Sequence, residues 1–171
     1  MILGSAVRPA TSLGVAHQGF VQRSQGILNS GIPESPSASF RILVNLAMVL
    51  GAATIGASAA IHLHLWLGGY RNVPRLGPLF LAQAVSGFTL ALVIVVFRRM
   101  FAVLAGAIFQ AASAIGLTLS ATVGFVGIHD GFGVPWATTS ITVELVGFVV
   151  LAASAVALWR NAEGDGDRPS S

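Results

Sequence analysis

Apolar residues fill four long stretches of the chain, and all charged residues but one fall between these stretches or in the two terminal segments. The stretches cover residues 42–70, 76–97, 100–129 and 131–159. Only Glu144, in the last of them, carries a formal charge within a stretch. Each stretch can hold the ~20 residues that cross about 30 Å of hydrocarbon as a helix. The pattern predicts four membrane spans, at about 43–67, 78–97, 101–127 and 137–159.

The spans are expected to be helices, which makes the fold class all-α. Backbone polar groups in lipid must be satisfied within one segment, and the apolar runs lack the alternation of a membrane barrel. Short connections favour antiparallel packing of consecutive spans. Gly68 and Gly69 are suited to end the first span, and Pro78 to begin the second. The sequence therefore predicts a four-helix transmembrane bundle over residues 41–160.

The two ends of the chain have a different composition. Residues 1–40 are rich in Ser, Gly, Pro and Gln, and 29–39 contain too few apolar residues to build a core. We therefore expect a disordered cytoplasmic tail over 1–40, with the first span acting as its own insertion signal. Residues 161–171 are expected to form a short, solvated acidic tail.

Composition and charge support a membrane location and exclude some functions. Hydrophobic residues make up 54% of the chain and charged residues 9%, and there is no cysteine for thiol chemistry or disulfides. All 9 basic residues are Arg, spread over tails and loops, so no nucleic-acid-binding stripe is expected.

The positions of the arginines also predict the topology. Only Arg71 and Arg75 fall on one side of the predicted membrane. The other side collects the remaining arginines: Arg8, Arg23, Arg41, Arg98, Arg99, Arg160 and Arg168. The positive-inside rule then places both termini in the cytoplasm and the protein in the inner, cytoplasmic membrane.

Small residues recur at helical spacing within the spans. Ala52, Gly56 and Ala60 lie on one stripe of the first span, and Gly106 begins a similar row in the third. Such rows allow helices to approach closely in membranes. We interpret them as packing surfaces.

A candidate buried polar cluster lies in the outer third of the predicted bundle. Its members are Glu144, His62, His64, Gln83 and His129. An acid at a depth of about 10 Å is costly unless it is neutral, paired or facing water, which makes it a functional-site hypothesis. Glu144 is expected to be protonated, or paired with a histidine, near neutral pH.

The histidines leave several interpretations open. His62 and His64 point about 200° apart on a helix, so they do not form one metal site in an ordinary way. Either of them with His129 and Glu144 would give a two-His, one-carboxylate set, but no compact ligand motif supports it. We therefore predict no metal site and no catalytic residues. Haem ligation by facing histidines stays a weaker alternative, and the cofactor is unknown.

One segment resembles a known group of proteins. Residues 62–87, HLHLWLGGYRNVPRLGPLFLAQAVSG, resemble a segment of small, uncharacterised four-span membrane proteins of actinobacteria. The residues that carry the resemblance are Trp66, Gly69, Tyr70, Arg71, Pro74, Gly77, Pro78, Leu79, Phe80 and Leu81. The resemblance implies a fold and an envelope location, and no activity.

The sequence is compatible with three functions. The leading hypothesis is a non-enzymatic accessory protein or subunit, whose partners are the lipid bilayer and either itself or a larger envelope complex. The second is a proton-linked small-molecule transporter that uses Glu144. The third is a quinone- or haem-linked redox protein that uses His62, His64 or His129.

Overall fold

The computed structural model describes residues 12–31, 37–124, 133 and 136–166, and every regular element in this part of the chain is helical. The elements are α1 (Ser12–Asn29), α2 (Ala38–Leu67), the short 3-10 helix η1 (Tyr70–Asn72), α3 (Leu76–Phe97), α4 (Met100–Thr122) and α5 (Ala137–Gly166). The predicted all-α fold class is confirmed.

Four of the helices, α2 to α5, are long and apolar enough to cross a membrane, as the sequence predicts. Their ends differ from the predicted ones at three places. The first begins earlier, at Ala38, and the last continues beyond 159 to Gly166. The third stops at Thr122, short of the predicted 127, and Gly124 follows with a φ of 84°, a conformation that suits glycine and ends helices.

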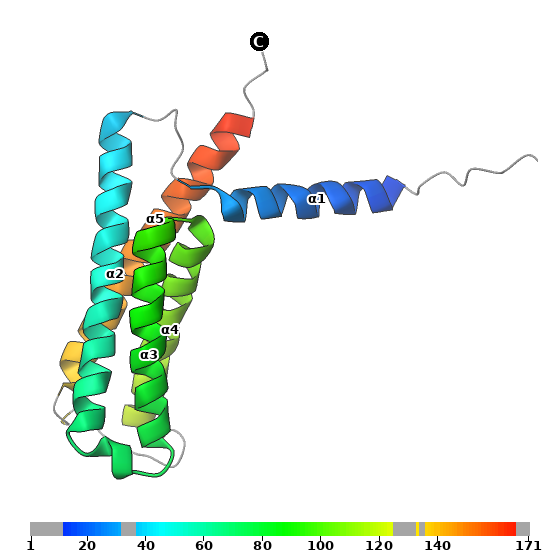
Figure 1. The fold of residues 1–171 in the computed structure, drawn as a ribbon. Helices are drawn as coiled ribbons and strands as arrows, with labels where there is room; N and C mark the ends of the chain where they lie inside the picture. The colour runs from blue at the N-terminus through cyan, green and yellow to red at the C-terminus, as the bar shows by residue number, and fades with distance from the viewer. Residues whose placement is uncertain (1–11, 32–36, 125–132, 134–135, 167–171) are drawn as a thin grey trace, which may run out of the picture.

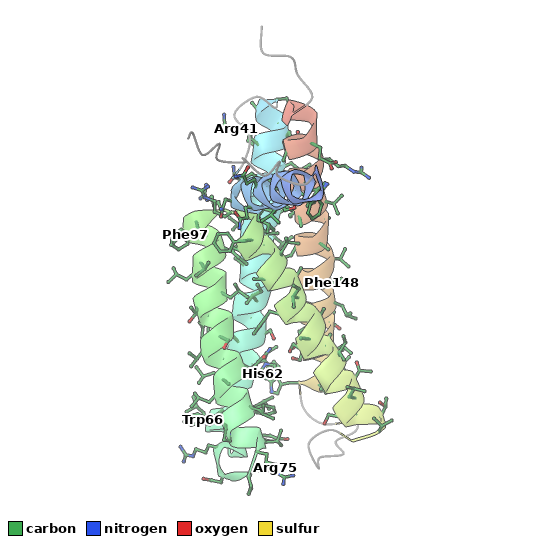
Figure 2. All side chains as sticks on the ribbon, turned by 90° about the vertical axis from the view of Figure 1, so that its right-hand side faces the viewer. Arg41, His62, Trp66, Arg75, Phe97 and Phe148 are labelled. Carbon is green, nitrogen blue, oxygen red and sulfur yellow. The ribbon has the colours of Figure 1, made fainter. Side chains whose placement is uncertain are left out.

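The spans pack as a bundle in the order α3, α2, α5, α4 (Figure 1). The most extensive contacts join α2 to α3, α4 to α5, and α2 to α5, whereas α2 and α4 touch each other little. Helix α5 therefore lies between α2 and α4. Consecutive spans pack together as predicted for two of the three pairs; α3 and α4 make fewer contacts because they diverge away from their short connection (Figure 2).

The apolar core lies toward the end of the bundle at which α3 and α4 are joined. Its fully buried large side chains include Met48, Ile55, Ile94, Met100, Leu151 and Leu158. Gly51 and Gly106 allow the close approach: a Cβ on Gly51 would lie 2.4 Å from Leu151, and one on Gly106 would lie 2.8 Å from Ile94. The predicted role of Gly106 in helix packing is thus seen directly.

Within the segment 1–40, for which the sequence predicts a disordered tail, residues 12–29 form the helix α1. Ile27 of α1 packs against the core of the bundle. Residues 1–11 and 32–36, to which the same prediction applied, lie outside the described residues.

Arginines lie at both ends of the bundle. Arg41 and Phe97 lie near one end and Trp66 and Arg75 near the other (Figure 2). Arg98 and Arg99, between α3 and α4, belong to the first end. Arg41, Arg98 and Arg99 thus lie at the end of the bundle opposite to Arg75 (Figure 2), as the sequence predicts.

Candidate functional site: a buried polar network

Glu144 lies in the interior of the bundle with no part of its surface exposed. It is in the second turn of α5, the helix that lies between α2 and α4. The helix begins directly after Trp136, whose carbonyl accepts a hydrogen bond from the Ser140 N–H at 2.8 Å. This first turn places Ser140 and Glu144, four residues apart, on the same face of α5.

Three serine hydroxyls donate hydrogen bonds to a single oxygen of the Glu144 carboxyl group. Ser58 of α2 and Ser140 of α5 each reach Oε1 at 3.0 Å, and Ser113 of α4 reaches it at 2.6 Å. Burial of a polar group costs free energy unless hydrogen bonds replace water, and hydroxyls from three segments do so here. The acid therefore joins α2, α4 and α5.

Gln83 extends this network to α3, the one span in the described part of the chain that does not bind Glu144 directly. Its Nε2 donates to the Ser113 Oγ at 2.8 Å, while the same Ser113 hydroxyl donates to Glu144. One chain of hydrogen bonds thus runs from α3 through α4 to α5 and on to α2. All four spans meet in it.

The second carboxyl oxygen of Glu144, Oε2, is buried and has no hydrogen-bond partner among the described residues. Gln110, one turn before Ser113 on α4, is also fully buried, and within the same part of the chain neither its Nε2 nor its Oε1 has a partner. A Cβ on Gly147, one turn after Glu144, would lie 2.2 Å from the Gln110 Nε2 and 2.4 Å from the Thr54 Oγ1. Gln110 is therefore seated against Gly147, in the layer next to the carboxyl group.

Of the predicted histidine partners, the two that the structure describes, His62 and His64, form no hydrogen bond with the acid. His62 Nδ1 lies 2.9 Å from the Ser58 carbonyl oxygen, and its ring meets Phe80 edge to face. His62 is thus next to the backbone of Ser58, whose hydroxyl binds Glu144, and does not bind the acid itself. His64 lies on another side of α2, edge to face with Trp136 at 5.7 Å between ring centroids. This separation follows from the two-residue spacing.

Of the five residues predicted for the cluster, the network connects Glu144 and Gln83 directly through Ser113. His129 lies outside the described residues. Among the residues the structure describes, no group of three or more His, Cys, Asp or Glu side chains comes together as it would around a metal ion.

Ser58, Ser113 and Ser140, which donate the hydrogen bonds to the acid that the described residues contain, were not predicted from the sequence. Signals for them were present. Ser140 precedes Glu144 by one helical turn, and Ser58 precedes His62 by one turn on α2. Serine is common in membrane helices, however, and often satisfies itself on its own helix backbone, so its presence alone does not select a partner.

No protein-family model, curated protein or solved structure matches this chain. The class of the protein therefore follows from its own fold. Four apolar helices packed around a buried polar network define a multi-pass integral membrane protein.

Proposed function

We propose that this protein is a non-enzymatic subunit or accessory protein of the inner membrane, with both termini in the cytoplasm. The observation that carries the proposal is the enclosure of Glu144. Its Oε1 accepts three hydroxyl donors from within the bundle, and its side chain is 0% exposed. An acid that is enclosed in this way joins helices rather than meeting a substrate.

Crosslinking in native membranes, followed by purification of the tagged full chain, tests the proposal. We expect one crosslinked species of fixed stoichiometry, either a homo-oligomer or a complex with a larger envelope protein. Glu144→Gln, which keeps an oxygen acceptor for the serines, should form the same species. An uncrosslinked monomer together with transport that depends on Glu144 would contradict the proposal.

A second candidate function is proton- or cation-linked transport, favoured by the unpartnered Oε2 of Glu144 and the unpartnered amide of Gln110. A proton or a small monovalent cation bound at Oε2 would give this oxygen a partner, and the Gln110 amide oxygen offers a further ligand for a cation. Glutamate and glutamine oxygens are suitable ligands for a hard cation.

Labelling with dicyclohexylcarbodiimide, which modifies protonated carboxyl groups in membranes, separates the two candidates. If Oε2 binds a cation, Na⁺ should lower the labelling of Glu144 at constant pH, and Gln110→Ala should abolish this protection. Choline chloride at the same ionic strength is the control. Labelling that is independent of Na⁺, with unchanged flux in Glu144→Gln proteoliposomes across the pH range, would remove the transport function.

A further inference from the structure

Helix α1 lies across the end of the bundle at which α3 and α4 are joined, and it extends away from the four spans (Figure 1). Its C-terminal end is attached there by two hydrogen bonds. The Met100 N–H donates to the Ser30 carbonyl at 3.2 Å, and the Arg99 guanidinium donates to the Asn29 carbonyl. The first N–H groups of a helix lack partners within it, so α1 supplies one for α4.

The point of attachment lies at the predicted membrane boundary. Arg98 and Arg99 directly follow the last apolar residue of α3 and are exposed. Arg98 Nη1 also donates to the Asn45 Oδ1 at 3.2 Å. Asn45 stands close to residue 43, where the sequence predicts that the first span begins. Helix α1 therefore leaves the bundle at the depth of the lipid headgroups.

The face of α1 that continues from the bundle core is apolar and uncovered. Ile27 packs against the core, and Phe20 lies seven residues earlier, on the same face of the helix. Phe20 is about 10 Å further from the bundle by the helical rise and is 73% exposed. Val21 and Leu28 form an adjacent exposed stripe, and the exposed Gln22 lies about 200° from Phe20.

We infer that α1 is an in-plane helix that inserts Phe20, Val21 and Leu28 into the headgroup–acyl boundary of an anionic leaflet. An amphipathic helix at this depth gains free energy by burying its apolar stripe in the interface. The exposed guanidinium groups of Arg41, Arg98 and Arg99 lie at the same end of the bundle and attract anionic headgroups. Lipid thus occupies the face of α1 that the described part of the chain leaves uncovered.

The chain has no cysteine, so single-cysteine variants of the full protein test the inference directly. Phe20→Cys and the matched control Gln22→Cys are labelled with an environment-sensitive fluorophore in nanodiscs that hold one protein each. Iodide in the buffer should quench the label at position 20 several-fold less than the label at 22. Lipids brominated near the headgroup should quench them in the reverse order.

Equal quenching of both labels by iodide would overturn the inference, because α1 would then lie in water. Protection at position 20 that appears only when two copies share a disc would also overturn it, because a second copy would cover the face. Replacing phosphatidylglycerol with phosphatidylcholine should increase the access of acrylamide, an uncharged quencher, to position 20, and no change would contradict the anionic preference. Val21→Cys repeats the test if Phe20→Cys does not fold.

Discussion

Glu144 combines one oxygen that accepts three hydrogen bonds with one that accepts none from the described residues. Hydrogen bonds between membrane helices contribute about 0.6 kcal/mol each on average, because the separated helices also find partners in the membrane. The two contacts that reach Glu144 from other helices, from Ser58 and Ser113, are therefore expected to stabilise the bundle by about 1–2 kcal/mol together, while Ser140 binds the acid within α5. Glu144 stabilises the bundle because it accepts several hydrogen bonds, each of which is weak.

Glu144→Leu should accordingly lower the stability of the bundle in mild detergent by about 1–2 kcal/mol, since Ser58, Ser113 and Ser140 lose a common acceptor. Glu144→Gln should stay within about 0.5 kcal/mol of the wild type because its amide oxygen still accepts. Thermal unfolding followed by size-exclusion chromatography measures both. A leucine variant as stable as the wild type would show that the network adds nothing.

Gly147→Ala should destabilise the protein by about 1–3 kcal/mol, because the added methyl overlaps with the Gln110 amide and the Thr54 hydroxyl. The same substitution in a Gln110→Ala background should cost less, which a double-mutant cycle measures. Gly116→Ala is the matched control, since a Cβ there meets nothing within 4 Å. Equal costs in both backgrounds would mean that Gln110 does not lie against Gly147.

Among the elements, α1 is the least expected one, and its contacts are confined to the end of the bundle. It supplies the Ser30 carbonyl to the Met100 N–H and packs Ile27 on the core. The four spans do not depend on it to reach the membrane, since their own apolar runs are long enough. It should therefore affect stability without affecting insertion.

Deletion of residues 1–35 should leave the amount of protein in the membrane unchanged and lower the thermal stability of the purified protein. The expected loss is about 1–2 kcal/mol, from one hydrogen bond to α4 and the apolar surface of Ile27. Deletion of residues 1–11 alone, which keeps α1, is the control. Loss of membrane accumulation in the longer deletion would assign the segment a role in insertion.

For the molecule as a whole, the distribution of arginines predicts the orientation. A cysteine at Asn72, next to η1, should react with an impermeant maleimide added to intact cells. A cysteine at Glu163, near the end of α5, should react only after permeabilisation. Labelling of position 163 from outside would reverse the topology.

The sequence predicted the four spans because a bilayer demands about 20 apolar residues in a row, a requirement visible without any tertiary information. It also predicted that Glu144 is buried with Gln83 nearby. It did not predict the serines, because the rotation of each helix about its axis decides which side chain faces the acid. His62 and Ser58 are one turn apart on α2, yet of these two residues it is Ser58 whose side chain binds the Glu144 carboxyl group.

The position of α5 between α2 and α4 has a consequence for biosynthesis. The ribosome delivers α5 after α2, α3 and α4, so a nascent chain with only these three spans in the membrane lacks the Glu144 acceptor for the Ser58 and Ser113 hydroxyls and leaves the narrow surfaces at Gly51 and Gly106 without α5 to cover them. Helices α2 and α4 share few contacts in the bundle, so they cover these surfaces of each other only in part. A chain truncated before Ala137 therefore exposes polar groups and gaps to lipid, which are features that a membrane protease or chaperone could recognise.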